Sequence, residues 1–131
     1  MTDFSAIHIS GLTKYYNHRI PALESLDLMV RKGEVFGFLG PNGSGKSTTI
    51  RLLLGFLHPT AGSAHVLGLD IVHQSVAIRR RIGYLPGGIA LYDTLTGEQL
   101  LDYLGKLTGR PSVRRGELCE RLELSASTLK R

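Results

Sequence analysis

A glycine-rich segment at residues 40–48, with the sequence GPNGSGKST, limits what this chain can fold into more than any other feature. Gly40, Gly45, Lys46 and Ser47 stand at the fixed positions of the pattern Gly, four residues, Gly, Lys, Ser or Thr. Glycines let a backbone adopt positive φ angles and bring its N–H groups close to an anion. The spacing therefore predicts a loop that binds phosphate groups.

The residues on either side of this segment predict a strand before it and a helix after it. Residues 35–39 are apolar or glycine, and they are few enough for a short buried strand. After the loop, apolar residues recur at the spacing of one helix face, at Ile50, Leu53, Leu54 and Leu57. A strand, a glycine-rich loop and a helix in this order are the context that the motif requires, and they predict an α/β fold.

The residue types of the loop predict how it would bind a nucleotide. Backbone N–H groups and the N-terminus of the helix would surround the α- and β-phosphates. Lys46 would reach the β- and γ-phosphates, the Ser47 hydroxyl would bind Mg²⁺, and Thr48 would donate to the α-phosphate. The candidate nucleotide-binding residues of the loop are Gly40, Pro41, Asn42, Gly43, Ser44, Gly45, Lys46, Ser47 and Thr48.

Composition excludes several other classes of protein. The 131 residues are 42% apolar, and no apolar run is long enough to cross a bilayer. A single cysteine, Cys119, excludes an internal disulfide and a cysteine metal cluster. Residues 1–5 lack the features of a secretory signal, so we expect a reducing, cytoplasmic location.

The net charge of +5 raises the question of a nucleic-acid partner. The clustered arginines are Arg79, Arg80, Arg81, Arg110, Arg114 and Arg115. No basic stripe interleaved with aromatic residues is present, so we favour solvated helix faces, near an anionic membrane surface or an acidic partner. Nucleic acid is not an expected partner.

Apolar and polar residues alternate at several places along the first two thirds of the chain. Strands are predicted around 6–12 and 26–30, forming an antiparallel ribbon that leads into the strand at 35–39. A fourth strand is predicted at 64–67, and Ser75 is a candidate N-cap for a basic helix through residue 80.

A further strand is predicted at residues 82–85, and the pattern then becomes helical. Thr96 and Gln99 have the spacing of a capping box at the start of a helix. The sequence Gly-Arg-Pro at 109–111 is expected to stop it, and Ser112 to begin another helix. We therefore expect residues 1–90 to form the β and phosphate-loop part of a core, and residues 91–131 to begin a helical subdomain.

The order of these motifs resembles the nucleotide-binding domain of ABC transporters from Leu12 to Leu107. The matching pieces are Lys14-Tyr15-Tyr16-Asn17, Gly33-Glu34, the phosphate loop, Gly55, Pro59, Gly62, Gly68 and Gly83-Tyr84-Leu85-Pro86. The resemblance implies a RecA-like P-loop NTPase core with an N-terminal antiparallel ribbon and an incomplete helical subdomain. The fine pattern is similar to the subfamily that exports drugs, lipids or polysaccharides.

The resemblance also implies roles for two positions outside the loop. Tyr16 matches the aromatic residue that stacks on adenine, with Tyr15 as the competing candidate. Gly87 stands where the family usually has Gln or Glu, which contacts Mg²⁺ and couples to the membrane partner. Gly87 has no side chain for this role, so we expect the role to be vacant or filled by water or backbone.

The chain ends at Arg131 without a match to the family's signature loop, acidic strand or switch histidine. Its five histidines lie upstream and are expected to be surface residues. The resemblance therefore implies half of an ATPase site, with ATP and Mg²⁺ as cofactors and no catalytic residue within these 131 residues. We also expect the isolated chain to fold poorly or associate, because sheet edges and apolar faces would lack partners.

The implied function is that of the ATP-binding subunit of an ABC exporter, peripheral at the inner face of the cell membrane. Its partners would be a second nucleotide-binding subunit and a transmembrane subunit. Two alternatives remain open from the sequence. One is a non-hydrolysing nucleotide-binding module, and the other is an ABC-type ATPase that acts on nucleic acid.

Overall fold

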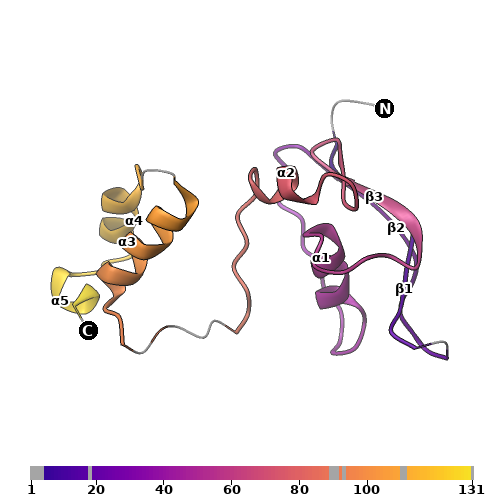
Figure 1. The fold of residues 1–131 in the computed structure, drawn as a ribbon, viewed down its shortest axis with the longest axis horizontal. Coiled ribbons are helices and arrows are strands. Elements are labelled where there is room, and N and C mark those ends of the chain that lie inside the picture. Colours follow the sequence, from indigo (N-terminus) through magenta and orange to yellow (C-terminus); the bar gives the residue numbers. More distant parts are fainter. Residues whose placement is uncertain (1–4, 18, 89–91, 93, 110–111, 131) are drawn as a thin grey trace. The chain divides into compact units, whose positions relative to one another are not determined.

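The computed structural model of the chain describes residues 5–17, 19–88, 92, 94–109 and 112–130. The chain divides into two units, residues 1–84 and 85–131. Figure 1 shows both units, with strands in the first and the helices α3, α4 and α5 in the second. The predicted boundary between residues 90 and 91 lies outside the described residues and stays a prediction.

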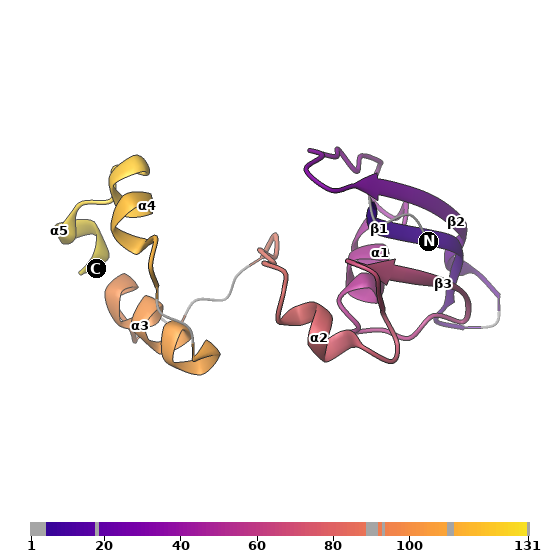
Figure 2. The same ribbon diagram turned by 90° about the horizontal axis from the view of Figure 1, so that it is seen from above.

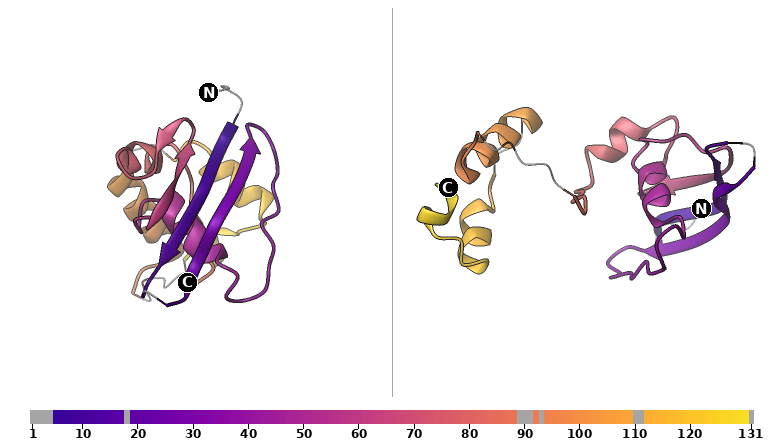
Figure 3. Two further views of the ribbon diagram at one scale, coloured as in Figure 1. Left: turned by 90° about the vertical axis from the view of Figure 1, so that its right-hand side faces the viewer. Right: turned by 90° about the horizontal axis from the view of Figure 1, so that it is seen from below.

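The first unit is built on a four-stranded antiparallel sheet in the order β2-β1-β3-β4. The strands are β1 (Ser5–Tyr15), β2 (Pro21–Arg31), β3 (Ala61–Val66) and β4 (Leu69–Asp70). β1 and β2 run side by side as the predicted ribbon (Figure 3, left), although both strands are longer than predicted. The strand expected at 64–67 is confirmed as β3, which begins at Ala61.

The close approach of the β1 and β3 backbones explains the glycine at position 62, near the start of β3. Gly62 has a φ of +79°, and a Cβ atom at this position would collide with the carbonyl oxygen of Gly11 in β1. Any side chain would force the two strands apart. Gly62 thus allows β3 to pair with β1 and close the sheet over the core.

The core lies between one face of this sheet and two short helices, α1 (Lys46–Leu53) and α2 (Ser75–Arg79). Figure 2 shows α1 against the sheet. The buried side chains come from every layer: Ile9, Leu12, Leu23, Leu52, Ala64, Val66, Ile71 and Ile78. Because β1 and β3 alternate apolar and polar residues, one face of the sheet covers the core and the other meets solvent.

The buried face of α1 differs from the predicted one. Thr49 and Leu52 are the buried residues of the helix, whereas Ile50 is 39% exposed, so the predicted apolar face is wrong at Ile50. Leu54 is buried, and Leu53 packs against the core. Thr49 can be buried because its hydroxyl donates to the carbonyl oxygen of Gly45 at 2.9 Å.

α2 is tied to the end of α1 by an arginine. The Arg79 guanidinium donates to the carbonyl oxygen of Leu54 at 2.8 Å and lies 5.7 Å from the centre of the Phe56 ring. A cation at the C-terminus of a helix satisfies a carbonyl group that has no partner within the helix. The predicted N-cap was wrong by one residue, because Ser75 is the first helical residue and Gln74 precedes it.

The segments 35–39 and 82–85 do not form the predicted buried strands. Both run without strand pairing, and the side chains of Val35, Leu39 and Leu85 are 101%, 92% and 81% exposed. A strand that is apolar on both faces suits the middle of a parallel sheet, where it needs neighbours on both edges. The strands within the described residues pair only with one another in antiparallel order, so neither segment has such a neighbour.

We predict that the apolar segment 35–39 drives self-association of the isolated chain. The double substitution Val35→Thr and Leu39→Thr lowers the exposed apolar area and should shift the protein towards monomer in sedimentation velocity runs. Ile20→Thr is the control, because Ile20 is 73% exposed but lies outside this segment. A wild-type chain that sediments as a monodisperse monomer would contradict the prediction.

Asp70 ends β4 and holds the turn that leads to α2. Its Oδ1 accepts the backbone N–H of Val72 at 2.9 Å and that of His73 at 2.8 Å, and the His73 ring Nδ1 lies 2.9 Å away. The N–H of His73 is the largest cause that lowers the pKa of the Asp70 carboxyl from its ordinary value, and partial burial opposes the shift. The ionised carboxylate is therefore the form that this turn stabilises.

We predict that Asp70 stabilises the first unit only while it is ionised. Since its folded pKa lies below its unfolded pKa, this contribution is complete above the ordinary value of about 3.9 and is lost as the pH falls through the folded value. Asp70→Asn should lower the thermal midpoint at about pH 6, and the difference from wild type should be smaller at a pH below the folded pKa of Asp70. An equal difference at both pH values would show that the charge plays no part.

The second unit contains α3 (Gly97–Thr108), α4 (Arg115–Arg121) and α5 (Ala126–Leu129). The predicted capping box is confirmed: the Thr96 hydroxyl accepts the N–H of Gln99, and the Gln99 side chain accepts the N–H of Thr96. Gly109, in the left-handed region, follows the end of α3. Arg110 and Pro111, the rest of the predicted stop, lie outside the described residues.

The helix predicted to begin at Ser112 begins three residues later. The Ser112 carbonyl accepts the N–H of Arg115 in a turn, and α4 starts at Arg115 itself. The Arg115 guanidinium also lies 2.5 Å from Asp102 Oδ1 and 3.8 Å from Glu98 Oε1, both in α3. This pairing joins α3 to the start of α4.

Candidate nucleotide-binding site

The predicted phosphate loop forms a small hollow at the N-terminus of α1. The hollow measures about 240 Å³ and is lined by Ala22, Asn42, Gly43, Gly45, Lys46, Ser47 and Thr48. Six of these residues belong to the predicted set, and the remaining predicted loop residues, Gly40, Pro41 and Ser44, contact Lys46. The structure thus brings the predicted loop residues together around one cavity.

Glycine at position 45 is required by both its backbone angle and its surroundings. Its φ is +92°, in the left-handed region that side chains disfavour. A Cβ atom there would lie 2.8 Å from the Ala22 carbonyl oxygen and 3.2 Å from Leu23 Cδ1. The loop therefore rests directly on the backbone of β2, and only glycine permits this contact.

Ala22 is the lining residue that sequence reasoning missed. It contributes its backbone carbonyl and a small side chain, and neither leaves a recognisable pattern in the sequence. Its place depends on the register of β2 against β1, in which Pro21 pairs with Tyr15 and Leu23 with Lys14. No local motif encodes that register.

We predict that Gly45→Ala disrupts the loop more than an ordinary glycine substitution would. Gly68→Ala is the matched control, because Gly68 has a similar φ of +78° but no atom within 4 Å of the place where its side chain would begin. Both variants carry backbone strain of roughly 1 kcal/mol, and Gly45→Ala adds the collision with Ala22. Urea unfolding should show a larger loss for Gly45→Ala, and equal losses would contradict the close contact.

The Lys46 ammonium folds back over its own loop. Its Nζ donates to the carbonyl oxygens of Gly40 and Pro41, the latter at 2.8 Å, and to Ser44 Oγ at 3.3 Å. An ammonium group has three N–H donors, so the loop itself can occupy all of them. Of the three acceptors, the Ser44 hydroxyl is the farthest and the easiest to exchange for an oxygen of a bound anion.

Ser47, Thr48 and Tyr16 complete the predicted set. Ser47 is exposed and lines the hollow, so its hydroxyl is accessible to a hard cation such as Mg²⁺. The Tyr16 hydroxyl lies 3.4 Å from Thr48 Oγ1, which places the aromatic ring beside the loop. Tyr15 pairs with Pro21 in the ribbon, and its N–H donates to Thr60 Oγ1 at 3.0 Å.

Other positions singled out in the sequence contribute no ligand cluster. Gly87 is exposed, and nothing lies within 4 Å of the point at which a Cβ atom would stand. Among the described residues, no group of three or more His, Cys, Asp or Glu side chains could hold a metal ion. His18 lies outside the described residues, while His58 and His73 are exposed.

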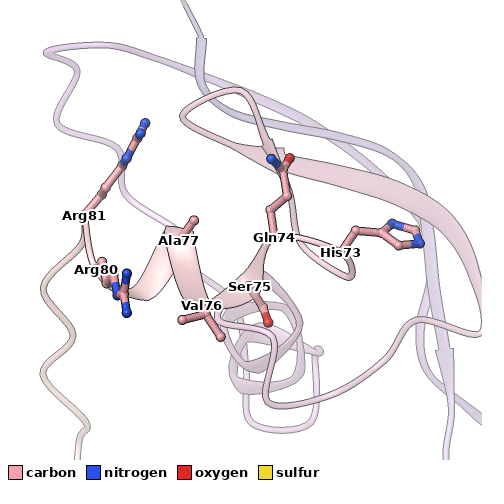
Figure 4. A pocket seen from close by; sticks show the side chains of 7 residues that line it. All are labelled: His73, Gln74, Ser75, Val76, Ala77, Arg80 and Arg81. Atoms are coloured by element: carbon pink, nitrogen blue, oxygen red, sulfur yellow. The ribbon is translucent and has the colours of Figure 1, made fainter.

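A second hollow in the first unit, of about 500 Å³, lies over α2 (Figure 4). Its lining includes Gln74, Ser75, Val76, Arg80 and Arg81. The side chains of Arg81 and Gln74 extend to one side of α2 in the figure, and those of Ser75 and Val76 to the other. They do not converge on a common point, so this hollow lacks the concentrated polar groups of the loop.

The helices of the described residues are too short or too polar for a bilayer, and none meets the requirements of a membrane span.

A glycine loop at a helix N-terminus beside an antiparallel ribbon defines a P-loop domain of the ATP-binding class. A sequence profile described as ABC transporter matches residues 23–130, so the chain belongs to the ABC transporter family. This confirms the resemblance and the fold class expected from the motifs.

Individual relatives agree with this assignment. A daunorubicin resistance ATP-binding protein of Streptomyces coeruleorubidus is 42% identical over 125 residues, covering 92% of this chain and 39% of the relative. A daunorubicin/doxorubicin resistance ATP-binding protein of Streptomyces peucetius is 45% identical over 104 residues, covering 79% of this chain and 31% of the relative. The chain thus spans less than half the length of these relatives.

A solved structure described as an ATP-binding subunit of an ABC transporter superposes with a TM-score of 0.77 at 27% identity. The match covers 95% of this chain and 54% of that structure. The fold therefore extends over nearly all of the chain.

Proposed function

We propose that this chain binds MgATP as part of the ATP-binding subunit of an ABC transporter. The observation that carries the proposal is the hollow at the N-terminus of α1, lined by the backbone of the glycine loop and by Lys46. It fits a polyphosphate, because Gly43 and Gly45 line the hollow without side chains and take the positive φ angles that turn backbone N–H groups towards an anion. A nucleotide adds a base, for which Tyr16 lies beside the loop.

Each residue of the site has a separate task in this proposal. The backbone N–H groups of 43–48 hold the α- and β-phosphates, helped by the partial positive charge at the start of α1. Lys46 exchanges its Ser44 contact for a β- or γ-phosphate oxygen. Ser47 holds Mg²⁺, which when bound neutralises charge between the phosphates, and Thr48 donates to the α-phosphate.

In a full-length subunit of this family, we propose that ATP hydrolysis drives export through a transmembrane subunit. Phosphoryl transfer needs a group that orients the attacking water, besides the phosphate loop and Mg²⁺. We place no catalytic residue in this chain, and we assign that group, with the signature loop of a second nucleotide-binding subunit, to the rest of the assembly. The relatives named for daunorubicin and doxorubicin resistance favour a drug or a similarly apolar molecule as the cargo.

The contacts of three of the six clustered arginines favour transport over a nucleic-acid partner. Arg79 is engaged by Leu54 and Phe56, Arg114 by Glu117 at 2.8 Å, and Arg115 by Asp102 and Glu98. Guanidinium groups held in this way do not form a row of available phosphate contacts. A peripheral position at the inner face of the cell membrane, against a membrane subunit, is the setting that we propose.

We predict that Lys46→Ala abolishes MgATP binding, lowering the affinity by at least about 100-fold in isothermal titration calorimetry, because it removes the charge that meets the β- and γ-phosphates. Ser47→Ala is the matched control within the loop, since it should keep ATP binding and lose its dependence on Mg²⁺. An unchanged ATP affinity in Lys46→Ala would show that the site assignment is wrong.

A further inference from the structure

Tyr16 is held from two sides in this structure. Its hydroxyl lies 3.4 Å from Thr48 Oγ1, in the first turn of α1. The Lys14 ammonium lies 5.8 Å from the centre of its ring, within the range of a cation–π contact. The side chain nonetheless remains 59% exposed, so a large part of the ring is accessible.

The Lys14 ammonium also makes a hydrogen bond to a residue other than Tyr16. Its Nζ donates to the carbonyl oxygen of His58 at 2.7 Å, in the segment between α1 and β3. Lys14 is the last residue but one of β1, and Tyr16 follows the end of that strand. Lys14 therefore joins the end of β1 to the segment after α1, with the Tyr16 ring beneath its ammonium.

We propose that Lys14 is a positioning residue for the nucleobase: its ammonium fixes one face of the Tyr16 ring and leaves the opposite face for stacking. The proposal rests on the proposed nucleotide-binding function and on Tyr16 as its base platform. An exposed tyrosine that is already ordered loses less side-chain entropy when a base stacks on it. A cation over one ring face also withdraws electron density, which reduces repulsion between the opposite face and the π electrons of a purine.

The competing role for Lys14 is that of a general cation near the phosphates. Such a cation would favour every polyphosphate, with or without a base. A positioning residue would favour only ligands that carry a base. The two roles therefore separate when MgATP is compared with the magnesium complex of inorganic triphosphate.

The experiment measures dissociation constants of both ligands by calorimetry for the full 131-residue chain. Lys14→Met keeps the length of the side chain and removes its charge, so it should weaken ATP binding roughly three-fold and leave triphosphate binding unchanged. Lys14→Arg should restore ATP binding, because a guanidinium both donates hydrogen bonds and stacks on aromatic rings. In a Tyr16→Ala background, Lys14→Met should have no further effect on ATP.

Two further variants control for a general loss of positive charge and for the loss of the hydrogen bond to His58. Lys106→Met removes a lysine charge from α3, and it should not weaken ATP binding relative to triphosphate binding. Lys14→Gln retains a donor for the His58 carbonyl but lacks the cation, and it should weaken ATP binding as Lys14→Met does. It also tests the proposal if Lys14→Met does not fold.

The possible outcomes distinguish the proposed role of Lys14 from the proposed nucleotide-binding function. Equal weakening of ATP and triphosphate, or an unchanged ATP affinity in both neutral variants, overturns the role of Lys14 and leaves the phosphate site intact. A further loss from Lys14→Met in the Tyr16→Ala background also overturns it. A wild-type chain that binds neither ligand refutes the proposed function and this inference together.

Discussion

The position of the phosphate loop depends on one close contact, between Gly45 and the Ala22 carbonyl of β2. Behind that contact, the Gly45 carbonyl accepts both the N–H and the hydroxyl of Thr49, which is buried in the first turns of α1. The glycine is thus held between a strand on one side and a helix on the other. Since residues 35–39 form no ladder within the described part of the chain, the ribbon and α1 position the loop.

The sequence predicted those features whose hydrogen bonds join residues close together along the chain. The loop residues are contiguous, and the capping box at Thr96 and Gln99 spans three positions, so their geometry follows from local chemistry. The ribbon of β1 and β2 is nearly as local, because the two strands adjoin along the chain. The stacking role that the family resemblance implied for Tyr16 stays a prediction, and the structure adds only that the Tyr16 hydroxyl lies 3.4 Å from Thr48 Oγ1.

The features that the sequence did not predict depend on distant partners. A strand at 35–39 or 82–85 requires neighbouring strands, and residue patterning alone does not report whether they are present. The position of the sheet determines which face of α1 is buried, and that face carries Thr49 and not Ile50. Thr49 can be buried because its hydroxyl donates a hydrogen bond to the Gly45 carbonyl. Ala22 lines the hollow and meets Gly45 through its backbone carbonyl, for which no motif exists.

The way in which Lys46 is satisfied by its own loop has a consequence for anion selectivity. An ion that approaches the loop competes with the acceptors that already surround the ammonium. Chloride or a single carboxylate would displace only the Ser44 hydroxyl and would leave the two carbonyl contacts of the ammonium in place. In the proposed site, a polyphosphate chain would also bind the N–H groups of the loop, so the internal bonding of the lysine would favour ligands that make several contacts at once over ions that make only one.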